Sequence, residues 1–165
     1  VEPRKNLPAL VSALASLDLD GLTLVVVGPT GWREDLAAAI APLGDRVVVT
    51  GPVDEATKHA WFDAAEVFCF PSLLEGFGLP VLEAMGHGTP VVTSAGTATE
   101  EVVGDAGLTV DPTDVDGLAD AVRRVLGDSD LAARLGAAGR FRAATMTWAA
   151  TAEATVGVYR EVLGR

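Results

Sequence analysis

One stretch of the sequence decides the fold: residues 67–93 read VFCFPSLLEGFGLPVLEAMGHGTPVVT. It opens with the apolar run Val67–Pro71, which is typical of a buried strand, and continues through a turn that contains glycine. Pro80–Met85 then shows a helical pattern, and Pro80 suits the first helical turn because a missing N–H costs nothing there. After a second glycine turn, Pro90–Thr93 is again apolar and β-branched. This order predicts a parallel strand–helix–strand unit.

The same alternation extends in both directions from this unit. Further strands are predicted at Thr23–Val27, Arg46–Thr50 and Leu108–Val110. Further helices are predicted at Leu7–Leu17, Glu34–Leu43, Ala56–Ala65, Val115–Leu126, Leu131–Ala144 and Trp148–Leu163. Continuous apolar strands between helices indicate an α/β fold with a doubly wound, Rossmann-like parallel sheet covered on both faces, followed by a helical tail. We expect Trp148 to pack this tail onto the sheet.

The chain lacks a strand at its beginning. Its first element is a helix, and residues 1–4 are too few to form the strand that a strand–helix–strand unit requires. In the usual doubly wound order the first strand is central, so the remaining strands must either flank a gap or close up. The missing strand would lie outside this sequence or come from a second copy, which makes a homodimer one hypothesis. We treat residues 1–165 as one domain of a longer protein.

Composition narrows the function classes. The 165 residues carry a net charge of −11, which argues against nucleic acid or an anionic membrane as a partner of this domain. The single cysteine, Cys69, excludes an internal disulfide and predicts a reducing, cytoplasmic location. It lies in an apolar run, where an inert, buried thiol is expected. No apolar stretch approaches the length needed to cross a bilayer.

The turn inside residues 67–93 can bind an anion. Gly76 and Gly78 allow the backbone to approach a ligand closely, and the free amides at the start of the next helix favour a negative group. Ligands of open α/β sheets bind at the carboxyl ends of the strands, where this turn would lie. Glu75 would face the crevice from the turn and Glu83 from the helix, and carboxylates are good acceptors for hydroxyl groups. A tight structural turn with a solvated Glu83 is the alternative.

The segment Glu75–Met85 resembles the hallmark segment of the family 4 (group 1) glycosyltransferases, which have the GT-B fold and two glutamates eight positions apart. Other parts of the chain agree with that family in order and spacing: Arg4–Leu7, Thr89–Val92, Gly104–Gly107, Val110–Pro112 and Thr147-Trp148. The resemblance covers essentially the whole chain. It implies that this domain is the nucleotide-sugar-binding half of a retaining glycosyltransferase.

The resemblance also implies roles for particular residues in binding and catalysis. Glu75 would bind hydroxyl groups of the transferred sugar and would not act as a covalent nucleophile. Lys5 would neutralise the diphosphate and stabilise its departure. Backbone amides would hold the sugar and the diphosphate, at Gly76, Phe77, Gly78 and Leu79.

The nucleoside would be held by a second group of residues. Glu83 would bind the ribose hydroxyl groups, and Gly51 and Val53 would lie along the base. The donor would be a GDP- or UDP-sugar, and no metal is expected, because no cluster of histidine and cysteine has ligand spacing.

The chain departs from the family pattern in two respects. The family usually carries an arginine a few positions before the lysine that Lys5 matches, and Arg4 does not have that spacing. The acceptor-binding domain is also absent. We therefore expect the isolated chain to be inactive, with the acceptor domain as its missing partner.

Two other functions compete with this interpretation. A dinucleotide-dependent oxidoreductase needs Gly-x-Gly-x-x-Gly, but Val81 stands where the third glycine of the turn should be. A non-catalytic nucleotide-binding module remains an alternative. Trp32, after a glycine turn, is a candidate to lie near the ligand, whereas His59 and His87 are expected to be solvated or capping residues.

Overall fold

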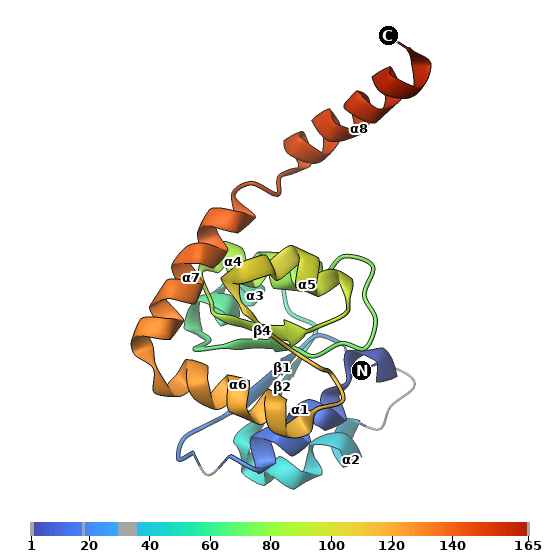
Figure 1. Ribbon diagram of the computed structural model, residues 1–165. Helices are drawn as coiled ribbons and strands as arrows, with labels where there is room; N and C mark the ends of the chain where they lie inside the picture. Colours follow the sequence, from blue (N-terminus) through green and yellow to red (C-terminus); the bar gives the residue numbers. More distant parts are fainter. Residues whose placement is uncertain (1, 18, 30–35, 165) are drawn as a thin grey trace.

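A computed structural model describes residues 2–17, 19–29 and 36–164, and its strands and helices alternate as predicted (Figure 1). The helices are α1 (Leu7–Ala15), α2 (Leu36–Ile40), α3 (Glu55–Ala64), α4 (Leu79–His87), α5 (Ala98–Val103), α6 (Val115–Gly127), α7 (Ser129–Ala143) and α8 (Trp148–Leu163). The strands are β1 (Leu24–Val27), β2 (Val47–Gly51), β3 (Phe68–Phe70), β4 (Val91–Ser94) and β5 (Leu108–Val110). Short 3-10 turns lie at η1 (Pro3–Lys5), η2 (Ala41–Arg46) and η3 (Gly104–Ala106). The α/β fold class is confirmed.

The strands form two parallel sheets, as expected if they flank the place of a missing strand. β1 pairs with β2, while β4 lies between β3 and β5. β1 and β3 are not hydrogen-bonded to each other. The strands therefore flank a gap between β1 and β3 and do not close up into one sheet. The homodimer hypothesis stays a prediction.

The central strand β4 joins the two layers of the core. All four of its residues are buried, and successive side chains point to opposite faces. Val92 packs in the apolar cluster that includes α1 and α6, whereas Val91 packs in the cluster formed with α3, α4 and α5. In Figure 1, these two groups of helices lie on opposite sides of β4. Coverage of both faces is thus confirmed for this strand.

Coverage of the outer strand β2 is incomplete, which differs from the expectation. Val48 and Val49 are exposed, although they belong to a continuous apolar run. Val47, at the start of the strand, and Ile40 of α2 both pack against the larger cluster. An apolar run predicts a strand, but it does not show whether helices cover both faces of that strand.

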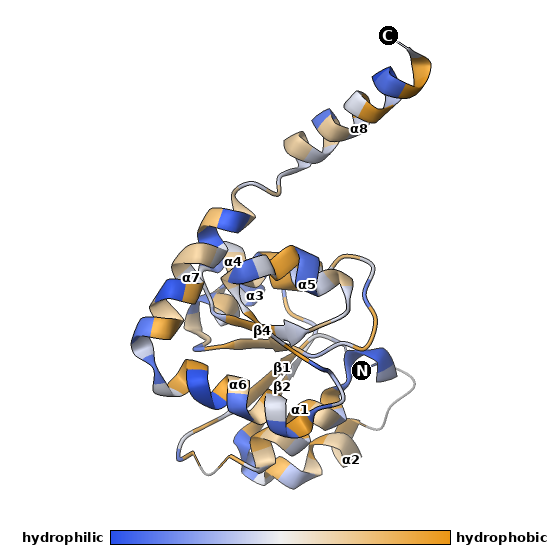
Figure 2. Ribbon diagram, viewed as in Figure 1, coloured by the Kyte–Doolittle hydropathy of each residue, from blue (hydrophilic) through white to orange (hydrophobic). Residues whose placement is uncertain are grey.

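The C-terminal helix α8 does not pack on the sheet, so the expectation for Trp148 was wrong. Trp148 is 83% exposed, and no residue described in α8 is buried. Figure 1 shows α8 projecting away from the layered body, and Figure 2 shows hydrophobic and hydrophilic segments alternating along it. The Thr147 hydroxyl accepts a hydrogen bond from the Ala150 amide and so fixes the start of the helix. Helical periodicity located this element correctly without indicating what it contacts.

Candidate functional site

Three hydrogen bonds attach the N-terminal segment to the carboxyl ends of the strands. The Leu73 amide, after β3, donates to the Arg4 carbonyl at 2.7 Å. The Asn6 side-chain amide donates to the carbonyls of Pro71 at 3.1 Å and Pro112 at 2.7 Å. Because Pro71 follows β3 and Pro112 follows β5, Asn6 holds this segment across the ligand edge of the sheet.

Asn6 also sets the direction of the chain at this point. Its φ of 57° and ψ of 37° place it in the left-handed region, where asparagine is one of the few residues without a large steric penalty. This conformation separates η1 from α1 and leaves the side chain free for its two carbonyl partners. The sequence pattern assigned no role to Asn6. Its residue type, between two helical segments, is the signal that could have indicated one.

Lys5 and Glu75 meet at this edge. Lys5 Nζ donates to Glu75 Oε1 at 2.6 Å and lies 4.5 Å from the centre of the Phe70 ring. The Glu75 side chain is only 10% exposed, so the ion pair is partly shielded from water. Arg4 Nη1 lies 2.8 Å from the same carboxylate oxygen. The structure thus brings together two residues, 70 positions apart, that the sequence predicted for one site.

The surroundings of Glu75 favour its ionised form. Burial acts to raise the pKa of this carboxyl group, but the hydrogen bond from Lys5 and the nearby charges of Lys5 and Arg4 outweigh it. The pKa of Glu75 is therefore lowered from its ordinary value. The fully buried Ser72 hydroxyl lies beside Glu75 and also favours the charged form of its carboxyl group, although the two groups are not in regular hydrogen-bond geometry.

The turn before α4 presents free backbone amides next to this ion pair. Gly78 adopts φ 103° and ψ 48° immediately before the first helical residue, and no side chain caps the helix. Within the described residues, the amides of Gly76, Phe77, Gly78 and Leu79 make no hydrogen bond. An uncapped helix start of this kind can bind an anion.

Buried threonines lie behind the turn. A Cβ atom at Gly78 would come within 2.6 Å of Thr99 Cγ2, so the turn can reach this depth only with glycine. The Thr99 hydroxyl is hydrogen-bonded to the hydroxyl groups of Thr93 at 2.8 Å and Thr97 at 2.7 Å. This network fixes the back wall of the turn. The sequence did not indicate the partnership, because Thr99 is 21 positions from Gly78.

Glu83 faces α3 from one turn along α4. Its Oε1 accepts a hydrogen bond from Lys58 Nζ at 3.0 Å, and Lys58 also contacts Glu55 at 2.9 Å. Hydrogen bonds to these two carboxylates outweigh desolvation and raise the pKa of Lys58. Glu83 is therefore not simply a solvated helix residue. The sequence pattern did not single out Lys58.

Gly51 and Val53 lie at the carboxyl end of β2, in the connection that leads to α3. Gly51 has φ of 68°, and its carbonyl accepts a hydrogen bond from the Gly28 amide at 3.0 Å. Val53 is half-buried. This connection leads into α3, the helix that carries Lys58, the partner of Glu83.

The two histidines form a small network on the surface, away from the turn. His59 Nδ1 and His87 Nε2 are 2.7 Å apart, and His87 Nδ1 is 2.6 Å from Asp63 Oδ1. These contacts join α3 to the end of α4, so the histidines are structural and not merely solvated. Trp32 lies outside the described residues.

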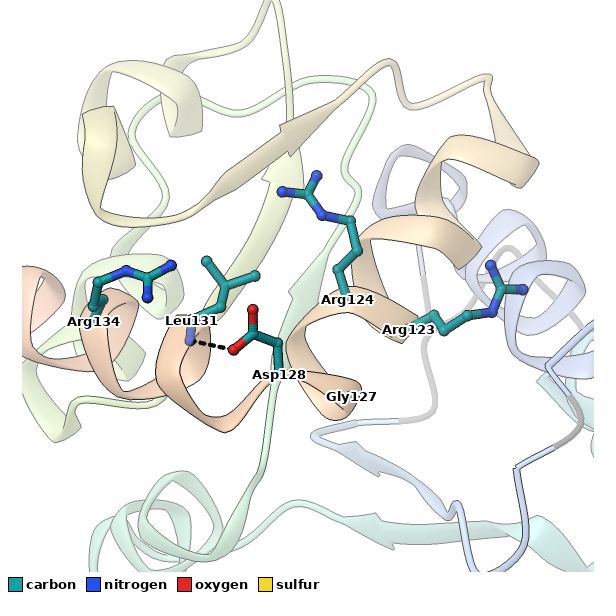
Figure 3. Close-up of a pocket in the computed structure, with 6 residues that line it drawn as sticks. All are labelled: Arg123, Arg124, Gly127, Asp128, Leu131 and Arg134. Carbon is teal, nitrogen blue, oxygen red and sulfur yellow. Dashed lines mark hydrogen bonds between the residues drawn. The ribbon is translucent and has the colours of Figure 1, made fainter.

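Two hollows are lined by residues of other regions. One, of about 360 Å³, lies at the junction of α6 and α7 and is lined by Arg123, Arg124, Gly127, Asp128, Leu131 and Arg134 (Figure 3). In this hollow the Asp128 carboxylate already caps α7 by accepting from the Leu131 amide at 2.9 Å. The other, of about 340 Å³, lies between α1 and Arg46. Free amides and converging cations, rather than cavity size, identify the candidate site.

Other types of site receive no support from the described part of the chain. No group of three or more histidine, cysteine, aspartate or glutamate residues there could hold a metal ion. None of the helices described has the length and apolar character required to span a membrane. Cys69 is half-buried and packs against the larger apolar cluster, where burial raises the pKa of its thiol to about 12 and favours the protonated form.

Residues 1–128 match the sequence profile of a family described as "Glycosyl transferases group 1". The chain is 36% identical over 166 residues to O-antigen chain mannosyltransferase B of Escherichia coli, covering 97% of this chain and 44% of that protein. It is 39% identical over 151 residues to a GDP-mannose-dependent alpha-(1-6)-phosphatidylinositol monomannoside mannosyltransferase of Mycobacterium tuberculosis, covering 84% and 39%.

The fold is also similar to that of solved structures. Sucrose-phosphate synthase from Thermosynechococcus elongatus superposes with a TM-score of 0.84 and 34% identity, over 99% of this chain and 43% of that one. The chain thus spans less than half the length of these relatives.

Proposed function

Because the chain belongs to the group 1 family of glycosyltransferases, we propose that its α4 edge binds a sugar nucleotide whose sugar the longer enzyme transfers with retention of configuration. The observation that carries this proposal is the set of free amides before α4, next to Lys5 and Glu75. A diphosphate needs both amide donors and cations. At this edge residues 76–79 provide the amides and Lys5, from the N-terminal segment, provides the cation.

The proposed roles follow the two sides of the edge. On the N-terminal side, Lys5 neutralises the diphosphate and stabilises its departure, while Glu75 binds sugar hydroxyl groups. The amides of residues 76–79 hold the diphosphate and the sugar between these side chains. On the other side, Glu83 binds the ribose, and Gly51 and Val53 line the base. In this proposal the donor lies along the edge in the order sugar, diphosphate, ribose and base.

The relatives favour a particular donor. One is named GDP-mannose-dependent and another is a mannosyltransferase, which supports GDP-mannose as the first donor to test. UDP-sugars remain the second class. Neither proposed role requires a metal, because Lys5 and the amides supply the positive charge and the hydrogen-bond donors.

We propose that the chain alone binds the donor without transferring its sugar. An acceptor must approach the anomeric carbon from outside this edge, and the residues that would bind it belong to the remainder of the protein. A cytoplasmic location also stays a prediction from the single cysteine.

Calorimetric titration with GDP, UDP, GDP-mannose, UDP-glucose and NAD tests the proposal. We expect Glu83→Ala to weaken the binding of a nucleoside diphosphate about tenfold, because charged hydrogen bonds to the ribose are lost. We expect Glu75→Ala to reduce the preference for the sugar nucleotide over the bare diphosphate.

Glu153→Ala on α8 is the matched control, since it removes an exposed carboxylate far along the chain from this edge. A preference for NAD, or no response to any nucleotide at millimolar concentration, would refute the proposed function. A transfer assay separates a domain of an enzyme from a non-catalytic nucleotide-binding module. If this is an enzyme domain, the full-length protein transfers the sugar to an acceptor and this chain alone does not.

A further inference from the structure

Arg4 has no assigned role, yet it lies at the centre of the candidate site. Its Nη1 atom is 2.8 Å from Glu75 Oε1, the same oxygen that accepts from Lys5 Nζ at 2.6 Å. The Arg4 Nε atom is also paired with Glu2 at 2.5 Å. The charged groups of Arg4 and Lys5, which are neighbours in the sequence, therefore both contact Glu75 Oε1.

This convergence has the geometry of an anion site that is already occupied. The Arg4 and Lys5 side chains are 41% and 31% exposed, so a ligand can reach both from solvent. The backbone that carries them is fixed by the Leu73–Arg4 hydrogen bond and by Asn6. The two positive groups are thus positioned by the fold before any ligand arrives.

The local charge balance determines what an incoming anion must do. Glu2 and Glu75 together cancel Arg4 and Lys5, so this group of side chains has no net charge. A diphosphate carries more negative charge than one carboxylate and attracts the two cations more strongly. A diphosphate that binds Arg4 and Lys5 would therefore compete with Glu75 for the two cations.

We propose that Arg4 and Lys5 act together as the cationic pair for the diphosphate, and that Glu75 is the built-in competitor that the diphosphate releases. This inference depends on the function proposed above and adds two things to it: a second cation, and a reason why Glu75 becomes free for the sugar only when the donor is bound.

Titration of this chain with inorganic pyrophosphate and with GDP tests the pair. Arg4→Gln should weaken pyrophosphate binding about fivefold, as expected for a partly exposed charge contact, and Arg4→Lys should restore most of it. Arg123→Gln is the matched control, because it removes an exposed arginine on α6, and it should change the affinity less than about twofold.

Glu75→Gln tests the competitor, and its effect should have the opposite sign. Loss of the internal carboxylate should raise the affinity for pyrophosphate and for GDP severalfold, while the gain in affinity from a sugar on the diphosphate disappears. Arg4→Gln should still weaken pyrophosphate binding in the Glu75→Gln background, because the arginine contacts the ligand itself.

If Arg4→Gln has no effect, or matters only while Glu75 is present, Arg4 merely holds Glu75 and the inference is wrong. A lower pyrophosphate affinity in Glu75→Gln would also overturn it. If either of these results is found while GDP and its sugar conjugates still bind normally, only the inference about Arg4 and Glu75 fails. If the wild type and every variant bind no nucleotide, the proposed function itself is refuted. Thermal unfolding of each variant confirms that it is folded.

Discussion

At the scale of single residues, the site depends on one carboxylate held in its charged form. Glu75 is nearly enclosed, and Lys5 and Arg4 compensate for the cost of burying it. The same residue is proposed to meet the sugar later. In this proposal the Glu75 carboxylate binds first the two cations and then the sugar, so its pairing with the cations must be reversible. Because Arg4 and Lys5 are both partly exposed, their attraction to Glu75 is weakened by water.

The lowered pKa of Glu75 predicts a pH dependence of stability. A group whose pKa is lower in the folded state stabilises the fold above its unfolded pKa, and this stabilisation is lost as the pH falls through the folded pKa. We therefore expect the free energy of unfolding to fall more steeply below about pH 4.5 in the wild type than in Glu75→Gln. Urea denaturation between about pH 3 and pH 7 measures the difference.

Other carboxyl groups titrate in the same range, including Asp54 and Asp111, whose pKa values are lowered by hydrogen bonds from threonines. They are unchanged in Glu75→Gln, so the difference between the two curves isolates the Glu75 pair. Parallel curves across the whole acidic range would show that the pair adds no stability to the fold.

At the scale of elements, the start of α4 has little tolerance for change. Gly78 has φ of 103°, and a Cβ atom there would collide with Thr99. We expect Gly78→Ala to destabilise the fold by about 2 kcal/mol or more, from backbone strain and the displaced threonine network. Gly76→Ala, two residues earlier, should cost less than about 0.5 kcal/mol, since a Cβ atom at that position would meet nothing within 4 Å.

Chemical denaturation of the two variants provides the measurement. If both variants lose the same free energy of unfolding, the contact between residue 78 and Thr99 is not the cause of the destabilisation. Nucleotide titration of Gly76→Ala adds a second comparison. Because this glycine is exposed and its amide is free, a loss of affinity without a loss of stability would mark close approach of the ligand to this part of the turn.

Elements were predictable from the sequence where local pattern and packing agree. β5 and α8 have the predicted bounds, and α4 was expected because a glycine turn and Pro80 mark its start. Both residues of the ion pair at this edge, Lys5 and Glu75, were predicted from resemblance to the family. The roles of Arg4, Asn6 and Lys58 could not be found, because each depends on a partner supplied by another element.

At the scale of the whole molecule, the layered body and α8 behave as separate parts. The body buries its apolar side chains in two clusters on either side of β4, whereas α8 buries none of its described residues. Its exposed apolar side chains are Trp148, Val156, Val158, Tyr159, Val162 and Leu163. Burial of apolar area is the main source of stability, so α8 adds little to the body in this chain.

Deletion of residues 148–165 should therefore change the free energy of unfolding by less than about 1 kcal/mol, because none of the residues described in α8 is buried. Urea denaturation of the full and shortened chains measures this directly. The shortened chain should also associate less at high concentration in sedimentation velocity, since the exposed apolar residues of α8 are removed. A loss of several kcal/mol would show that α8 packs onto the body in solution. Nucleotide affinity should be unchanged, because Lys5, Glu75, Glu83 and the turn before α4 all belong to the body.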